Sequence, residues 1–115
     1  MNRFLLPLAG LAAVSVIGLA AGCGGAGITG APVATNKVAM VKSYRFDPNR
    51  IEVTSGDTVT WTNDDNFTHT VKVDGRDDHK VDRGESFSIR FEKPGTYHYV
   101  CTLHSRDMEG EVIVR

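Results

Sequence analysis

The sequence carries almost no net charge and shows no convincing helical pattern. Its 13 lysine and arginine residues nearly balance 14 aspartate and glutamate residues, which leaves a formal net charge of −1. The basic residues are scattered, so neither nucleic acid nor an acidic surface is expected as a partner. No internal repeat is visible, and 115 residues leave room for one domain only.

Cysteine is equally scarce. The chain contains only Cys23 and Cys101, far apart in the sequence. The two thiols could pair in an oxidising compartment. That pairing is excluded if Cys23 is lipidated, so the use made of Cys23 decides whether Cys101 is a free thiol.

The first 22 residues differ from the rest of the chain. Residues 4–21 are almost wholly apolar or small and follow a short, weakly positive start. This pattern predicts a signal peptide over residues 1–22 and an exported protein. A retained membrane anchor is the alternative, because the apolar run is about long enough to span a bilayer. Pro7, Gly10 and Gly18 interrupt that run, which favours the signal peptide.

The signal ends in Leu19-Ala20-Ala21-Gly22-Cys23. This segment resembles the lipobox of bacterial lipoproteins, in which small residues precede a cysteine that is acylated and becomes the new N-terminus. The resemblance implies a lipid anchor on Cys23 that tethers the protein to a membrane face. The expected location is the periplasm or the outer face of the cell membrane. An ordinary signal cleavage that leaves Cys23 free is the alternative.

A composition change marks the start of the folded domain. Gly, Ala and small polar residues dominate residues 24–36, which contain too little apolar surface to order themselves. Residues 23–36 are therefore interpreted as the lipidated cysteine and a flexible linker. The folded domain is expected to span residues 37–115.

Within that domain the apolar residues recur with a period of two, which is typical of strands. Turn signals separate the runs, among them Asp74-Gly75, Pro94-Gly95 and Gly110. Short strands with one apolar face predict an all-β fold, an antiparallel sandwich or barrel of about seven or eight strands. The inward positions are expected to be Ile51, Val53, Val59, Trp61, Phe67, His69, Val71, Val73, Phe87, Ile89, Phe91, Tyr97, Tyr99, Cys101, Val112 and Val114.

Folding alone does not explain two of these inward residues. His69 and Cys101 both lie on the apolar side of their strands, and Cys101 is followed by a loop that contains His104 and Met108. Thiolate and thioether are soft donors suited to Cu(I), and imidazole binds copper well. Two His, one Cys and a weak axial Met form the donor set of a blue-copper electron-transfer site.

Each donor also has a plainer interpretation. A single inward His is more often a hydrogen-bonded core residue, a lone inward Cys a small buried hydrophobe, and Met108 an ordinary core residue. His79 lies in a polar stretch interpreted as a solvated loop, and His98 has the opposite parity to Cys101, so neither is expected to bind copper. Residues 64–66 form a polar turn with too few oxygen donors to favour a hard cation.

The sequence resembles the cupredoxin family, especially its plastocyanin- and amicyanin-like members. The similarity covers residues 44–53 (YRFDPNRIEV), residues 56–63 (GDTVTWTN) leading to His69, and most diagnostically residues 94–112. It implies a Greek-key β-barrel with one type 1 copper ion. The family's ligand positions fall on His69, Cys101, His104 and Met108.

Three departures from the family pattern concern the site. Three residues separate His104 from Met108, where family members commonly have two or four. Thr70 stands where Asn often braces the ligand loops. Ser105 and Arg106 replace the apolar surface often found beside the exposed His.

The resemblance implies single-electron transfer between redox partner proteins by a monomer that is not an enzyme. A copper carrier or buffer with the same ligands remains the alternative. Oxidases and nitrite-reducing enzymes need further copper-binding His in H-x-H pairs, which are absent, and a dinuclear copper site needs a second nearby Cys. Structural zinc sites usually have short paired-ligand spacings. A metal-free adhesion-like sandwich is the remaining alternative.

Overall fold

The computed structural model describes residues 28–115, so the expected signal peptide and Cys23 lie outside the described residues. The described part contains ten strands and no helix, and therefore no helix able to cross a membrane. The strands are β1 (Val33–Ala34), β2 (Lys37–Val41), β3 (Arg45–Asp47), β4 (Arg50–Val53), β5 (Thr58–Asn63), β6 (His69–Val73), β7 (His79–Val81), β8 (Ser86–Arg90), β9 (Gly95–Val100) and β10 (Glu109–Val114).

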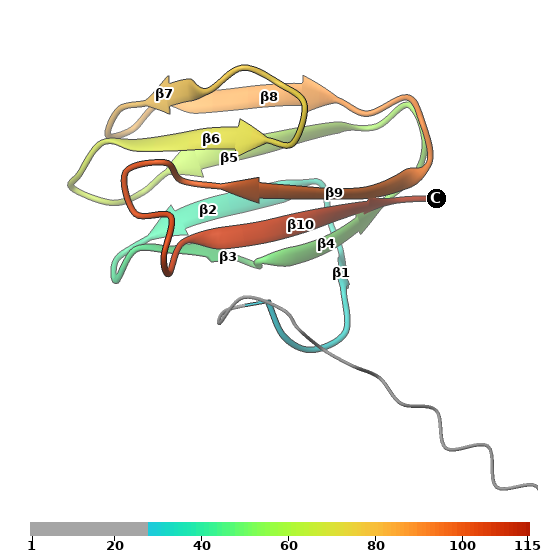
Figure 1. Ribbon diagram of the computed structural model, residues 1–115, viewed down its shortest axis with the longest axis horizontal. Coiled ribbons are helices and arrows are strands. Elements are labelled where there is room, and N and C mark those ends of the chain that lie inside the picture. The colour runs from blue at the N-terminus through green and yellow to red at the C-terminus, as the bar shows by residue number, and fades with distance from the viewer. Residues whose placement is uncertain (1–27) are drawn as a thin grey trace, which may run out of the picture.

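The strands form two sheets, with the orders β1-β4-β10-β9-β6-β7 and β3-β2-β5-β8 (Figure 1). This arrangement confirms the all-β sandwich or barrel. Both sheets are mixed, however, because β4 runs parallel to β1 and β10, and β2 runs parallel to β5. Alternation in a sequence reveals which side chains face inward, but it carries no information about the direction of the neighbouring strand.

The short strands account for the difference between ten strands and the seven or eight expected. Strands β1, β3 and β7 have two or three residues each, too few for an alternating pattern to be visible. Strand β1 lies in the segment interpreted as linker, and nearby the Arg50 guanidinium donates to the Gly30 carbonyl at 2.6 Å. His79, which was expected in a loop, begins β7 and is exposed.

The core between the sheets follows the predicted alternation in most strands. Trp61, at its centre, is fully buried and lies edge-to-face with Tyr99, with ring centroids 5.2 Å apart. Phe46 also lies edge-to-face with Tyr99, with ring centroids 4.8 Å apart. Aromatic pairs in this geometry contribute beyond the area they bury. The buried apolar set is continuous with Cys101 and Met108 at one end of the sandwich.

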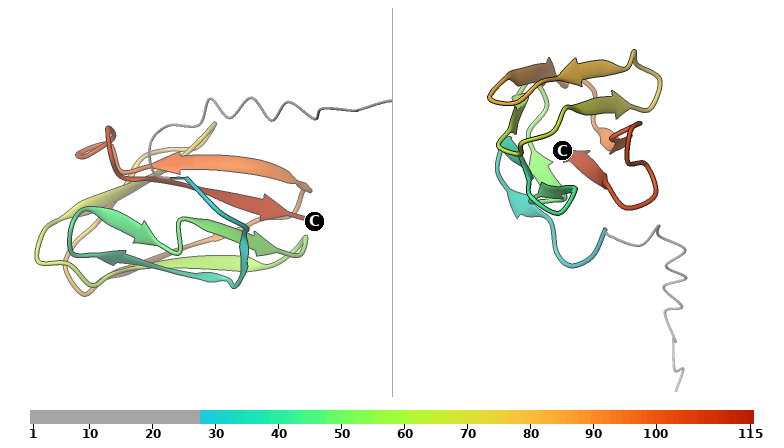
Figure 2. Two further views of the ribbon diagram at one scale, coloured as in Figure 1. Left: turned by 90° about the horizontal axis from the view of Figure 1, so that it is seen from below. Right: turned by 90° about the vertical axis from the view of Figure 1, so that its left-hand side faces the viewer.

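Three connections meet at that end of the molecule. The β2–β3 turn, the β5–β6 loop and the β9–β10 loop all lie at the left of Figure 1, and the right-hand view of Figure 2 looks onto them. Segments that are distant in the sequence therefore share one end of a rigid framework. Binding residues are often located on such loops because the framework fixes their positions.

The prediction of a turn at Gly110 was wrong. It lies inside β10, where it is buried and pairs with Tyr99 of β9, and it does not form a turn. A Cβ at this position would lie 2.4 Å from the Tyr99 hydroxyl oxygen and 2.6 Å from the Asn49 carbonyl oxygen. Glycine is therefore required because the Tyr99 ring and a neighbouring backbone approach β10 closely.

We predict that Gly110→Ala destabilises the domain by about 2–4 kcal/mol, because the added methyl displaces a buried ring or the backbone of Asn49. Urea unfolding of the metal-free protein measures the loss. Gly75→Ala is the control, since that glycine has φ of +77° and a Cβ added there would have no atom within 4 Å. Its cost should be about 1 kcal/mol, from backbone strain alone. Equal losses in the two variants would contradict the steric explanation.

Candidate metal centre

The predicted ligands come from the ends of three strands. His69 begins β6, Cys101 directly follows β9, and Met108 directly precedes β10, with His104 in the loop between Cys101 and Met108. Strands β6 and β9 are antiparallel neighbours, with Lys72 opposite Val100. This register brings the start of β6 beside the residues that follow β9.

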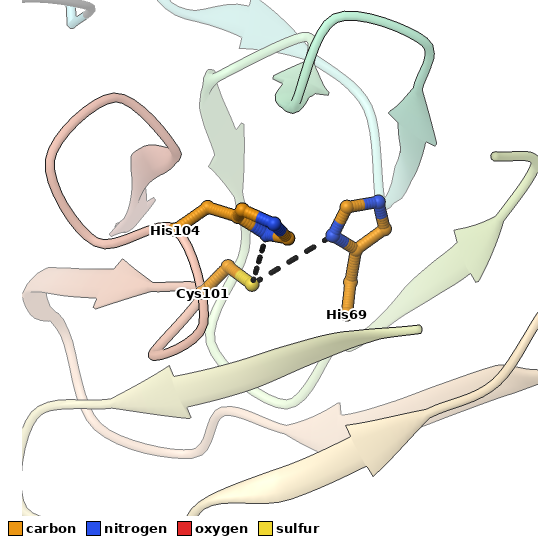
Figure 3. Close-up of side chains that lie close together, drawn as sticks. All are labelled: His69, Cys101 and His104. Atoms are coloured by element: carbon orange, nitrogen blue, oxygen red, sulfur yellow. Dashed lines mark hydrogen bonds between the residues drawn. The ribbon is translucent and has the colours of Figure 1, made fainter. Parts of the chain in front are cut away.

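The structure brings three of the predicted ligands together (Figure 3). The Cys101 Sγ lies 3.7 Å from the His69 Nδ1 and 3.6 Å from the His104 Nδ1, and all three ligand atoms lie within 4.8 Å of one another. Both imidazoles present the same nitrogen to the sulfur. His69 and Cys101 are fully buried, whereas His104 is partly exposed.

These separations suit a single shared ion. Zinc, an ion similar in size to copper, forms bonds of about 2.3 Å to a thiolate and about 2.0 Å to an imidazole. If these two bonds meet at a trigonal angle, the sulfur and nitrogen atoms are about 3.7 Å apart. The observed distances of 3.6 and 3.7 Å match that sulfur–nitrogen spacing. One thiolate and two neutral imidazoles form the strong-donor set expected for copper.

Backbone hydrogen bonds hold Met108 at the same end of the sandwich as His104 and Cys101. Its amide donates to the His104 carbonyl at 3.0 Å, and its carbonyl accepts the Cys101 amide at 3.0 Å. The five residues from His104 to Met108 thus form one closed turn, which accommodates the unusual spacing. The Met108 side chain is fully buried and belongs to the same core cluster as Cys101. Its role as the axial donor stays a prediction.

A buried carboxylate holds the outer nitrogen of His69. The Asp65 Oδ2 lies 2.9 Å from the His69 Nε2, and both side chains are almost completely buried. This hydrogen bond lowers the pKa of the Asp65 carboxyl below its usual value, although burial acts in the opposite direction. An ionised Asp65 requires the proton of His69 on Nε2, which leaves the Nδ1 lone pair free to bind a metal.

Asp65 was expected only as part of a polar turn, because nothing in its spacing marks it as a partner of His69. The loop is fixed by the buried side chain of Asn63, whose amide donates to the carbonyls of Phe67 and Val81 at 2.8 and 2.9 Å. In this loop Phe67 is 56% exposed, which contradicts its assignment to the apolar face. The strand begins only at His69, so the alternation does not extend back to Phe67.

Thr70 of β6 contacts the β9–β10 loop, residues 101–108, which contains three of the predicted ligands. Its amide donates to the Cys101 Sγ at 3.4 Å, and its hydroxyl oxygen accepts the Thr102 amide at 2.7 Å. The two threonine hydroxyls lie 2.8 Å apart, and that of Thr102 donates to the Asp78 carboxylate at 2.7 Å. The threonine therefore braces the loops at the position where the family often has Asn.

The remaining histidines lie outside this cluster, as expected. His98 is half-exposed and faces Glu109, with 3.2 Å between the His98 Nε2 and the Glu109 Oε2. His79 stacks on Phe87 with ring centroids 3.8 Å apart. Within residues 28–115, His69, Cys101 and His104 form the one group of three His, Cys, Asp or Glu side chains close enough to share a metal ion.

The surface around His104 is more apolar than Ser105 and Arg106 suggest. Phe67 and Leu103 are 56% and 57% exposed, and Tyr44 lies between Phe67 and His104 with ring centroids 5.8 and 4.4 Å away. The apolar groups come from the β2–β3 turn and the β5–β6 loop as well as from the ligand loop. Residues next to His104 in the sequence therefore describe only part of its surroundings.

A small β-sandwich with a buried thiol and two imidazoles gathered at one end is typical of a class of metal-binding β proteins. Residues 33–115 match the model of the copper-binding plastocyanin/azurin family, and the chain belongs to that family. Copper is accordingly its metal, and the fold is that of the cupredoxins.

Individual relatives agree with this assignment. The chain is 30% identical to amicyanin-alpha of Methylorubrum extorquens over 119 residues, which cover 97% of this chain and 98% of the relative. It is 35% identical to the chloroplastic plastocyanin of Oryza sativa subsp. indica over 120 residues, covering 92% and 75% of the two chains. A purple cupredoxin from Nitrosopumilus maritimus has a similar structure, with a TM-score of 0.62, 26% identity, and coverage of 70% of this chain and all of that one.

We predict that Thr70→Val lowers the stability of the metal-free protein by about 1–2 kcal/mol, because the Thr102 amide loses its acceptor at a partly buried position. The isosteric side chain fills the same space, so packing is preserved. Thr70→Ser keeps the hydroxyl and serves as the control. Denaturant unfolding measures both variants. If Thr70→Val is as stable as the parent, or if Thr70→Ser loses as much, the brace contributes nothing.

Proposed function

We propose that this chain carries single electrons through a mononuclear type 1 copper site held by His69, Cys101, His104 and Met108. The observation that supports this most directly is the convergence of one thiol and two imidazole nitrogens within 4.8 Å at the end of a cupredoxin framework. Copper, when bound, supplies a one-electron couple between its cuprous and cupric forms.

The protein's part is to hold these donors in place. A site that is rigid in both oxidation states needs little rearrangement when an electron arrives or leaves. His69 and Cys101 are fixed by Asp65 and by the Thr70 amide, at 2.9 and 3.4 Å. The side chains of His69, Cys101 and Met108 have no exposed surface, so water is excluded from that side of the site.

His104 is the proposed point of exchange with redox partners. It is the only one of the four proposed donors with exposed surface. An electron that enters or leaves through its imidazole crosses the shortest layer of protein. The neighbouring aromatic and aliphatic side chains make this end of the molecule suitable for brief contact with another protein.

We further propose that the protein is exported and anchored to a membrane by a lipid on Cys23. The apolar residues 4–21 and the lipobox-like residues 19–23 support this interpretation. A tethered, monomeric domain on the periplasmic or outer face of the cell membrane would meet its redox partners there. Mass spectrometry of the mature N-terminus tests the lipid directly.

A copper carrier or buffer with the same ligands is the alternative function. Repeated oxidation and reduction of the copper-loaded protein in the presence of a copper chelator separates the two. An electron carrier should retain its copper and exchange electrons rapidly, whereas a carrier of copper should release the ion during cycling. Copper loss within a few cycles would contradict electron transfer.

We predict that Cys101→Ser abolishes the intense visible absorption of the copper-loaded protein, because that absorption requires a copper–thiolate bond. The barrel should remain folded, since the serine side chain is smaller and sits at the end of the core; circular dichroism provides this control. A Cys101→Ser protein that stays intensely coloured would rule out the proposed site.

We also predict that Met108→Leu shifts the reduction potential while copper stays bound, because the axial donor tunes the potential and the three strong donors remain. Leucine conserves the volume of this fully buried side chain, so the fold should tolerate it. Voltammetry and copper analysis measure the two outcomes. If neither the potential nor the visible spectrum changes, Met108 is not the axial donor.

A further inference from the structure

The β2–β3 turn has an unusual backbone beside the metal centre. Ser43 and Tyr44 have φ angles of +81° and +55°, the only positive φ values of non-glycine residues within residues 28–115. The left-handed region is unfavourable for side chains other than glycine, and it is unusual for a residue as large as tyrosine. Such strain persists only where surrounding contacts hold it, and it is concentrated at functional sites.

The contact that this turn makes is with His104. The ring centroids of Tyr44 and His104 are 4.4 Å apart, with 32° between the ring planes. Tyr44 also lies edge-on to His69, with a centroid distance of 6.0 Å. The tyrosine, 60 positions before His104 in the sequence, therefore covers one face of the imidazole and touches the other proposed histidine ligand.

The two histidines differ in what else fixes them. The outer nitrogen of His69 is held by the buried Asp65 at 2.9 Å. In the part of the chain that the structure describes, no protein group forms a hydrogen bond with the outer nitrogen of His104, whose ring is partly exposed and belongs to a loop. The inner nitrogen of His104 faces the Cys101 sulfur at 3.6 Å, and the His69 ring lies edge-on to it with centroids 5.2 Å apart. Tyr44, at 4.4 Å, makes the closest ring contact with His104 and can keep this imidazole from rotating outward.

We propose that Tyr44 is a positioning residue that locks the His104 imidazole by stacking, so that Nδ1 stays directed at the Cys101 sulfur. The functional consequence rests on the proposed copper function: His104 would keep its orientation while the site gains and loses an electron. The lock itself belongs to the protein and exists before copper binds. It is the aromatic counterpart of the carboxylate that holds His69.

Three variants of the full-length chain test this role. Tyr44→Gly removes the ring and also relieves the strain of the positive φ. If the Tyr44 side chain contributes nothing, this variant should therefore be at least as stable as the parent protein. Tyr44→Phe keeps the stacked ring without its hydroxyl. Phe67→Ala is the control for the loss of an exposed aromatic ring near the site. The ring centroids of Phe67 and Tyr44 are 5.8 Å apart, but Phe67 does not stack on His104.

The first measurement needs no metal. Nuclear magnetic relaxation of the His104 ring in the metal-free protein should show increased mobility in Tyr44→Gly, and parent-like order in Tyr44→Phe and Phe67→Ala. The second measurement is copper release to a chelator. Release should be about tenfold faster in Tyr44→Gly, the lower end of the effect found when an outer-sphere partner of a metal-binding His is removed.

An unchanged His104 ring and unchanged copper release in Tyr44→Gly would overturn the proposal, as would equal effects in Phe67→Ala or in Tyr44→Phe. Failure of the electron-transfer function is distinguishable from these results. It would appear as copper loss during redox cycling of the parent protein, while the metal-free measurement would still report whether Tyr44 orders His104.

Discussion

The position of the Cys101 sulfur relative to β6 is the constraint on which the rest of the site depends. Where β9 ends, the Thr70 amide donates to that sulfur, and the Thr70 hydroxyl oxygen accepts the next amide of the departing chain. Side-chain atoms thus continue the pairing of the two strands for two more residues. The thiol is fixed at the point where His69 begins β6, so the sheet register determines the distance between the first two donors.

The two imidazoles are then oriented by different means. His69 lies inside the sandwich, where an unpaired ring nitrogen would be costly, and the buried carboxylate of Asp65 satisfies it. His104 lies at the surface, where water can satisfy its outer nitrogen, so a hydrogen bond is less necessary there. We attribute the restraint to an aromatic neighbour, since the Tyr44 ring packs against the His104 ring with centroids 4.4 Å apart. The buried and the exposed imidazole therefore need different supports, although the two proposed ligands are chemically identical.

The alternation of apolar residues was informative where residues lie in regular strands and uninformative in the loops, where His104 was predicted only from its donor chemistry and the family resemblance. Alternation placed His69 and Cys101 inward because each lies at the end of a strand, where the period of two still applies. The loops follow no such period, so nothing marked Asp65 or Tyr44 as neighbours of the proposed ligands. Gly110 was misassigned for a related reason. A glycine that signals a turn and a glycine that admits a neighbouring ring are identical in a sequence, and only the approach of Tyr99 distinguishes them.

Rigid support of the donors favours electron transfer over copper delivery. Delivery to another protein requires one ligand after another to leave the ion, and a partner's ligands must be able to approach it. Three of the four proposed donors have no exposed surface, and each is held by a hydrogen bond of its side chain or backbone within the protein. Only His104 faces outward, and Tyr44 restrains it. If these four side chains hold copper as proposed, the site would hinder ligand exchange, while the exposed imidazole of His104 would still let an electron pass.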